Sequence, residues 1–453
     1  MEALELARAQ FAANITFHIL FPSISIGLAW LLFYFKLAYV KTRDSIWLEA
    51  YTFWVKIFAL TFAMGVVSGI TMSFQFGTNW PGFMKTVGNV AGPLLGYEVL
   101  TAFFLESVFL GIMLFGIRRV PERVHTVATF LVAFGTMLSA FWILVLNSWM
   151  QTPVGFEMKD GVAHVTSWLE ILSSPSLLPR FLHMTVASFL TASFLISGIS
   201  AYRLLMRKWT PSVETTLKIG LVLAAVFSPI QLFLGDIHGL NTLKYQPQKI
   251  AAMEGNWNTQ GNVPLLLFAI PDEKERKNTF EIGIPSGASL ILKHHTDGIV
   301  PGLNEYKDNH PPVKPVFYAF RIMVGVGLLM ILISWVAAYV LWKKRELPPF
   351  LIKAMVGMTF SGWIATVAGW YVSEVGRQPW LVHDILKTAN AASSIPAETI
   401  GLSLSMYVVT YIALTISYIL LLFYLARRAD QRGLRVENEI DNNLGLFISR
   451  GAL

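Results

Sequence analysis

The chain has 453 residues, of which 54% are hydrophobic and only 14% charged, and its formal net charge is +7. A mean hydropathy of +0.55 is too high for a soluble domain and indicates an all-α membrane protein that crosses the bilayer several times. The absence of cysteine excludes thiolate-bound iron–sulfur clusters, covalent c-type haem and disulfides. The positive charge does not indicate nucleic-acid binding, because the basic residues gather in clusters between apolar segments.

Nine apolar segments are long enough to cross a bilayer as α-helices. The first of them is long enough to be retained rather than cleaved as a signal peptide. We therefore predict about nine transmembrane helices, at residues 15–38, 53–76, 94–117, 125–149, 181–204, 219–237, 316–342, 350–372 and 400–425.

Lysine and arginine cluster in every second connection between these spans and again after the last one. Cytoplasmic connections carry an excess of basic residues, so the alternation predicts an N-terminus outside the membrane and a C-terminus in the cytoplasm. The clusters are Lys36, Lys41 and Arg43; Arg118, Arg119 and Arg123; Arg203, Arg207 and Lys208; Lys343, Lys344 and Arg345; and Arg427, Arg428, Arg432 and Arg435.

One connection is much longer than the others and occupies residues 239–315, between the sixth and seventh spans. It is polar and ends in the proline-rich string HPPVKP, and the same count places it outside the membrane. Loops of this length are usually functional or disordered. We therefore divide the chain into residues 1–238 with six spans, the extracytoplasmic loop 239–315, and residues 316–453 with three spans and a cytoplasmic tail.

Two carboxylates, Glu98 and Glu106, lie inside the third predicted span, whose sequence is LLGYEVLTAFFLESVFLGIMLFGI. A charged residue at the centre of a membrane helix costs roughly 2.5–3.5 kcal/mol on insertion scales, and such residues mark proton paths, ion sites or metal ligands. On a regular α-helix this spacing separates the two residues by roughly 12 Å along the axis and about 80° around it, so both can face one cavity.

Further candidate ligands lie near the outer ends of other spans. His18, His183 and Met323, with Arg321 beside it, are near the outer starts of the first, fifth and seventh spans, and Glu374 is at the outer exit of the eighth. Imidazole, thioether and carboxylate groups at one depth suit axial ligation of haem iron, and His183 with Met323 would be a His/Met pair. Carboxylate ligation suits a high-spin iron with an open position for a gas.

Each of these residues also has an ordinary structural explanation. A lone histidine inside a helix, such as His18 or His183, is as often a hydrogen-bonded packing residue as a ligand. Met323 alone would most often fill a core, and Glu374 could form a helix-end ion pair with Arg377. The intramembrane carboxylates are harder to explain in this way. The other histidines lie at span ends or in loops, where a structural role is the better interpretation.

Four strings in chain order resemble subunit I of the cytochrome bd-type quinol oxidases: FQFGTNW at 74–80, FFLES at 103–107, FRIM at 320–323 and GRQPW at 376–380. The resemblance covers essentially the whole chain, and the brevity of the long outer loop matches the short Q-loop branch of the family. It implies a terminal oxidase of the bacterial cytoplasmic membrane. Such an enzyme oxidises quinol at the outer face and reduces oxygen to water with cytoplasmic protons, which generates proton motive force.

The resemblance also implies roles for individual residues. His183 and Met323 match the axial pair of a low-spin haem b, with Arg321 beside it. His18 and Glu374 match ligands of two high-spin haems, one b-type and one d-type; relatives differ in which haem takes which residue and in whether haem b replaces haem d. The other matches are Glu98 as a further carboxylate at that pair, Glu106, Ser107 and Ser139 as a path for cytoplasmic protons, Trp370 as an aromatic between haems, Arg377 as a basic residue near the high-spin haems, and Lys249 and Glu254 as quinol-interacting residues of the Q-loop.

The same resemblance implies partner subunits within the lipid bilayer. They are a second large membrane subunit (subunit II) and, as a further candidate, a small single-span subunit. The sequence names neither the quinone nor the number of accessory subunits.

Three other classes of membrane protein compete with this interpretation. Haem–copper oxidases need more intramembrane histidines than His18 and His183. A di-haem cytochrome b would carry paired histidines on the same helices, and no span has such a pair. The remaining alternative is a transporter that couples protons through Glu98 and Glu106, and it predicts a protein without haem.

Overall fold

The computed structural model describes residues 2–307 and 309–450, with side chains described up to residue 429, so Arg432 and Arg435 of the predicted C-terminal basic cluster lie outside the described side chains. Within this part of the chain, nine helices are long and apolar enough to cross a membrane, which confirms the predicted number. They extend beyond the predicted limits and occupy Ala3–Thr42, Ser45–Thr78, Pro81–Phe115, Glu122–Gln151, Trp168–Leu205, Pro211–Tyr245, Val313–Lys344, Pro349–Val375 and Ala397–Ala429.

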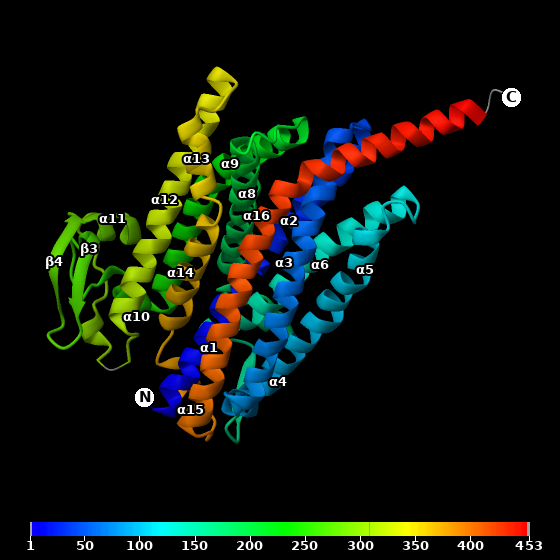
Figure 1. Ribbon diagram of the computed structural model, residues 1–453. Coiled ribbons are helices and arrows are strands. Elements are labelled where there is room, and N and C mark those ends of the chain that lie inside the picture. Colours follow the sequence, from blue (N-terminus) through cyan, green and yellow to red (C-terminus); the bar gives the residue numbers. More distant parts are fainter. Residues whose placement is uncertain (1, 308, 451–453) are drawn as a thin grey trace.

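The helices form one elongated bundle, with the N-terminus at one end and the C-terminal end of α16 (Ala397–Arg450) leaving from the other (Figure 1). We call these two ends the N-side and the C-side. The connections that follow α2 (Pro22–Thr42), α5 (Phe104–Phe115), α8 (Leu177–Leu205) and α12 (Val313–Lys344) lie on the C-side. These connections contain the predicted basic clusters, so most of the clustered lysines and arginines gather at a single end of the bundle.

Two of the spans are not single regular helices. In the first span, α1 (Ala3–Leu20) ends just before Pro22, because proline is tolerated in the first turn of a helix but not in its interior. The third span consists of α4 (Pro81–Tyr97), the π-helical turn η1 (Glu98–Phe103) and α5. The prediction of regular α-helical geometry along this span is therefore wrong, and π turns of this kind are frequent at functional sites.

Helix α8 lies at the centre of the bundle. It packs against α2, α6 (Glu122–Gln151), α9 (Pro211–Tyr245), α13 (Pro349–Gly357) and α14 (Ser361–Val375). The approach of α2 to α8 is close enough to require glycine, since a Cβ added at Gly27 would lie 2.6 Å from the carbonyl oxygen of Ser188. A further long helix is α3 (Ser45–Thr78).

The connections on the N-side contain three two-stranded antiparallel sheets, so the all-α description holds for the spans but not for the whole chain. The long loop begins after α9, which continues to Tyr245 rather than ending at residue 238. Its elements are α10 (Pro247–Glu254), β3 (Leu265–Asp272), β4 (Lys277–Ile284), α11 (Gly287–Lys293) and η2 (Leu303–Glu305). The other connections contain β1 (Phe156–Lys159), β2 (Val162–Val165), α7 (Trp168–Leu172), β5 (Trp380–Val382), β6 (Leu386–Lys387) and α15 (Thr388–Ala391).

Candidate functional site

His18 on α1 is held in a fixed orientation by a serine of the neighbouring α3. Its Nδ1 lies 2.9 Å from Ser68 Oγ, and this hydroxyl donates its own proton to the carbonyl oxygen of Met64 at 2.8 Å. Ser68 Oγ therefore accepts a hydrogen bond from Nδ1–H, which leaves Nε2 as the nitrogen with a free lone pair. Gly69 makes room for the ring, since a Cβ there would lie 3.3 Å from His18 Cε1. The arrangement suits an imidazole that binds iron through Nε2.

His183 on α8 also lies against a polar side chain and a glycine of a neighbouring helix, here α9, but its bonded nitrogen is Nε2 rather than Nδ1. Its Nε2 lies 3.2 Å from the side-chain nitrogen of Gln231, and a Cβ at Gly235 would lie 3.3 Å from its Cε1. Its Nδ1 is buried without a hydrogen-bond partner among the described residues. If the Gln231 amide nitrogen donates to Nε2, Nδ1 holds the ring proton and is a buried donor without an acceptor, which is costly. Gln231 Oε1 is also buried without a partner among the described residues. Side chains alone therefore do not satisfy the polar atoms around His183, and the ring has capacity for a ligand.

Met323 on α12 points at a glycine of α14. A Cβ at Gly369 would lie only 3.0 Å from Met323 Sδ, so glycine is needed for the thioether to occupy this position. Each of the three predicted nitrogen or sulfur ligands, His18, His183 and Met323, thus contacts a glycine on a neighbouring helix.

Contacts between α1 and α14 fix the relative depth of two of these ligands. Thr16 Oγ1 and Tyr371 Oη are hydrogen-bonded at 2.8 Å. Because the two helices run in opposite directions along the bundle, His18 lies close to the level of Gly369, the glycine that contacts Met323. A third contact brings in α8: Arg180 Nη1 donates to Ser373 Oγ at 2.8 Å. His183 follows Arg180 by about one turn, as Gly369 precedes Ser373, so it lies near the same level.

Helix α6 provides a second ruler for depth. Thr185 Oγ1 on α8 donates to Met137 Sδ at 3.7 Å, which places His183 near the level of Ser139. Ser139 Oγ in turn donates to Glu98 Oε1 at 2.7 Å. Four of the predicted ligands, His18, His183, Met323 and Glu98, therefore share one level of the bundle.

Glu106 lies further towards the C-side, but less far from Glu98 than regular helical geometry predicts. A Cβ at Gly135 would meet Glu106 Cγ at 2.6 Å, and Gly135 precedes Ser139 by four residues on α6, or roughly 6 Å of rise. The two carboxylates therefore contact positions on α6 that are roughly 6 Å apart, about half of the roughly 12 Å that regular helical geometry predicts for their backbone spacing. Glu106 is buried and its Oε1 has no partner among the described residues, whereas the side chain of Ser107 is exposed on the surface of α5.

Glu374 lies nearer the N-side than the other ligands and is held by several donors. Its Oε1 accepts from Asn147 Nδ2 at 2.9 Å and from Gln151 Nε2 at 3.4 Å, and its Oε2 accepts from Arg377 Nη2 at 2.5 Å. A carboxylate offers about four acceptor sites, two on each oxygen. Oε1 also accepts from Ser373 Oγ at 3.3 Å, so Oε2 is the oxygen that retains capacity for a further bond. Trp370, one turn before Glu374, is partly buried against the apolar core of the N-side half of the bundle.

Two further basic residues surround Glu374. The sequence analysis missed Arg180, which also donates to Asn147 Oδ1 at 3.3 Å; its only signal was an arginine close to His183 at the start of a span. Lys249 of α10 donates to Gln151 Oε1 at 2.7 Å and to the carbonyl oxygen of Ser373 at 3.1 Å. Burial and the two neighbouring arginines hold the pKa of Lys249 well below its usual range. Lys249, predicted to interact with quinol, thus reaches into the surroundings of Glu374.

Glu254, at the other end of α10, belongs to a different group. Its Oε2 lies 3.6 Å from Arg321 Nη2, and burial raises the pKa of Glu254 although Arg321 opposes this rise. Arg321 donates through Nε and Nη2 to the carbonyl oxygen of Leu266 at 3.0 and 2.8 Å and through Nη1 to that of Met253, and it covers the ring of Phe317 at 3.6 Å. Arg321 lies on the same helix as Met323, two residues closer to the N-side.

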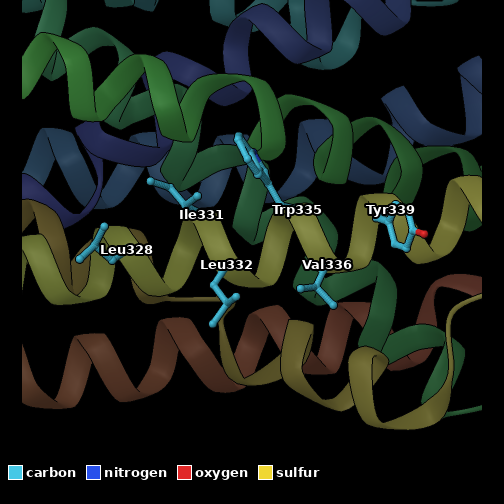
Figure 2. A pocket seen from close by; sticks show the side chains of 6 residues that line it. All are labelled: Leu328, Ile331, Leu332, Trp335, Val336 and Tyr339. Atoms are coloured by element: carbon cyan, nitrogen blue, oxygen red, sulfur yellow. The ribbon is translucent and has the colours of Figure 1, made fainter.

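The surface of α12 carries a separate hollow of about 510 Å³, which contains no histidine, carboxylate or basic side chain (Figure 2). One of its lining side chains, Trp335, is fixed by a hydrogen bond from Nε1 to the carbonyl oxygen of Ala225 on α9. Its composition suits an acyl chain rather than a catalytic centre. It is lined by Leu328, Ile331, Leu332, Trp335, Val336 and Tyr339.

The comparison with known families decides between the remaining alternatives. The family model of cytochrome bd terminal oxidase subunit I matches residues 6–430, which is nearly the whole chain. The chain belongs to this family. Among its relatives are the cytochrome bd ubiquinol oxidase subunit 1 of Bacillus subtilis, 35% identical over 97% of this chain and 96% of that protein, and the cytochrome bd-II ubiquinol oxidase subunit 1 of Escherichia coli, 33% identical over 94% and 96%.

A solved structure agrees with the sequence relatives. The bd oxidase of Geobacillus thermodenitrificans superposes with a TM-score of 0.87 at 28% identity, over 94% of this chain and 99% of that one. The chain is therefore a subunit of a haem-containing terminal oxidase in the bacterial cytoplasmic membrane, and the transporter alternative is not favoured. The side chains fit haem, since His18 keeps Nε2 free and the buried polar atoms around His183 are not satisfied by the described residues.

Proposed function

We propose that this quinol oxidase subunit carries three haems, and that His183 and Met323 would hold the iron of a low-spin haem b. Two observations support this pair. Both side chains lie near one level of the bundle, and each lies against a glycine whose lack of a side chain leaves room for it. The unsatisfied buried atoms at His183, its own Nδ1 and Gln231 Oε1, carry the assignment, because an ordinary packing histidine and its amide partner would satisfy both of them within the described chain.

His18 and Glu374 are the proposed ligands of the two high-spin haems, one b-type and the other d-type or a second b-type. When bound, haem supplies the electron carriers and the iron at which oxygen is reduced. The chain's own contribution is orientation: Ser68 fixes the tautomer of His18, and Asn147 and Arg377 hold the carboxylate of Glu374. Glu98 lies at the same level as His18 and is the further carboxylate of this centre.

The proposed orientation puts the N-side outside and the C-side in the cytoplasm. The gathering of the basic connections on the C-side supports it, because cytoplasmic connections are rich in lysine and arginine. In this orientation the chain divides into residues 1–238, the outer loop 239–315, and residues 316–453. The centre lies nearer the outer surface, and protons for water formation must cross from the cytoplasm.

Glu106 and Glu98 are proposed to carry these protons, with Ser139 between the helices. The buried Oε1 of Glu106 makes no hydrogen bond in the described chain, so it can bind a water on the cytoplasmic side of Glu98. Ser139 donates to Glu98 and orients the receiving carboxylate. Ser107 is exposed on α5, so its part in the path requires a neighbouring subunit, and subunit II is the proposed neighbour; a small single-span subunit is a further candidate partner.

Quinol oxidation is assigned to the outer loop, with Glu254 as the group that accepts a hydroxyl proton. Burial raises the pKa of Glu254, which makes its carboxylate a stronger base than an exposed one. Arg321 faces Glu254 and lies beside Met323 on α12, so the base is adjacent to the proposed low-spin haem.

Purified protein tests the proposal directly. We expect a coloured preparation with bound haem by pyridine-haemochrome analysis, and oxygen uptake on addition of a short-chain quinol. A folded, colourless protein would overturn the assignment and favour a transporter. A haem-loaded protein that consumes no oxygen with quinol would overturn the oxidase role of this chain while keeping the haem sites.

A further inference from the structure

The surroundings of Glu374 are unbalanced in charge. Three basic side chains, Arg180, Lys249 and Arg377, converge there and are only 7%, 2% and 4% exposed. The carboxylate with which they interact is that of Glu374. Buried basic groups are costly unless they are paired with anions. Three of them against one carboxylate are costly in the chain alone, where burial and the neighbouring arginines lower the pKa of Lys249, and further negative charge would stabilise all three in their charged form.

The same cluster also has too few hydrogen-bond acceptors. Arg180 Nε and both Nε and Nη1 of Arg377 are buried without a partner among the described residues. Arg321 in the neighbouring site differs, because its Nε and both terminal nitrogens donate to backbone carbonyls and it faces Glu254. Shortage of acceptors and excess of basic groups therefore occur together at one of the two sites.

We propose that Arg180, Lys249 and Arg377 form a binding site for two carboxylates, the propionate groups of a porphyrin on the Glu374 side. This inference rests on the proposed function and assigns Lys249 to the haem centre rather than to quinol. Guanidinium groups bind carboxylates with paired hydrogen bonds, for which the unpartnered nitrogens of both arginines are available. Two propionates would supply the two negative charges that the cluster lacks, in a buried position between α8, α10 and the end of α14.

The imbalance has a consequence for electron transfer. A porphyrin would bring the same two carboxylates to either site. The Glu374 site holds three basic groups and one acid, whereas the site of Glu254 and Arg321 holds one basic group and one acid. The more positive surroundings stabilise the extra electron of reduced haem. The charges of this chain should therefore raise the reduction potential of a haem on the Glu374 side relative to that of a haem held by His183 and Met323.

Redox titration of the purified complex tests the inference, with absorption bands separating low-spin from high-spin haem. In Lys249→Gln and Arg180→Gln we expect the high-spin haems to be lost or to become at least about tenfold harder to reduce, a shift of about 59 mV for a one-electron couple. The low-spin haem should keep its potential. Lys249→Arg should restore most of the shift. Arg43→Gln, which breaks an exposed ion pair with Glu122 on the C-side, is the matched control and should change neither potential.

The outcomes separate this inference from the proposed function. Parent protein without haem refutes the proposed function itself. Haem-loaded parent with unchanged potentials and haem content in Lys249→Gln and Arg180→Gln refutes the inference alone, as does an equal shift of both haem types. If Arg180→Gln does not accumulate, Lys249→Gln carries the test, because its charge lies on a short helix outside the spans. Phosphorus that co-purifies with the parent and is lost in the variants, with haem retained at its original potentials, would assign the cluster to a lipid phosphate and also refute it.

Discussion

The two ends of the short helix α10 serve sites of opposite character. Glu254 at its C-terminal end faces Arg321, whose nitrogens all have acceptors. Lys249 near its start enters a buried cluster around Glu374 that has an excess of basic groups and several unpartnered donors. Residues that are close in sequence and predicted to share one quinol site therefore contact different parts of the molecule. The loop helix connects a balanced site beside Met323 with an unbalanced one beside Glu374.

Removal of a ligand on the balanced side should have the largest effect. In His183→Ala we expect loss of the low-spin haem and of quinol-driven oxygen uptake, because neither nitrogen remains to bind iron. The high-spin bands should persist, since His18 and Glu374 are untouched. Absorption spectra and haem counts check this result. Loss of every haem at once would contradict the separation into two sites.

The base on the balanced side gives the next prediction. Glu254→Gln keeps the size of the side chain but cannot accept a proton, so kcat/KM for quinol should fall by about 10²–10⁴-fold. Haem content and both potentials should stay close to those of the parent, in contrast to Lys249→Gln. Steady-state kinetics together with spectra check the pair of variants. Matching behaviour of the two variants would show that α10 serves one site after all.

The pH dependence sharpens the same comparison. Burial raises the pKa of Glu254 from 4.5, and the opposing charge of Arg321 lowers it. A base must be ionised, so kcat/KM for quinol should fall as the pH decreases through this raised pKa. Arg321→Gln removes the opposing charge and should move the acidic limb of the profile to higher pH, whereas Glu254→Gln should abolish that limb. An acidic limb unchanged in both variants would exclude Glu254 as the base.

The proposed proton path lies on the side of the high-spin haem ligands. Glu106→Leu removes a buried carboxyl group that contacts no haem ligand directly, so the spectra should be retained while turnover falls by about 10²-fold. The hydroxyl of Ser107 is exposed, so Ser107→Ala should lower turnover only if a neighbouring subunit completes the path. Normal turnover in Glu106→Leu with intact spectra would remove Glu106 from the path.

The spans and several candidate ligands could be predicted from the sequence because both signals are local. Apolar runs of sufficient length identify the nine helices, and His18, His183, Glu98 and Glu106 are conspicuous as polar groups within or near such runs. The π turn at Glu98 could not be predicted, since no residue pattern specifies it.

The supporting residues were missed because they depend on how helices pack. Arg180 lies at the start of a span, where a charge is ordinary, and only the contact of α8 with α14 brings it to Ser373. Ser68 and Gln231 are unremarkable in sequence and gain importance from the histidines beside them. The grouping of Lys249 with Glu254 came from the family resemblance and stays a prediction, since the two side chains contact different neighbours at opposite ends of α10.

The smallest expected effect comes from the glycine that lies between the two sites. Gly369 contacts Met323 and precedes Glu374 on α14, and in Gly369→Ala the new Cβ would lie 3.0 Å from Sδ. The sulfur must move by a few tenths of an ångström, so we expect a modest shift of the low-spin band and potential with the high-spin bands unchanged. Gly111→Ala on α5, where nothing lies within 4 Å, is the matched control and should alter neither. A shift confined to the high-spin bands would instead couple Gly369 to Glu374, and the boundary between the balanced and unbalanced sites would then lie on the other side of α14.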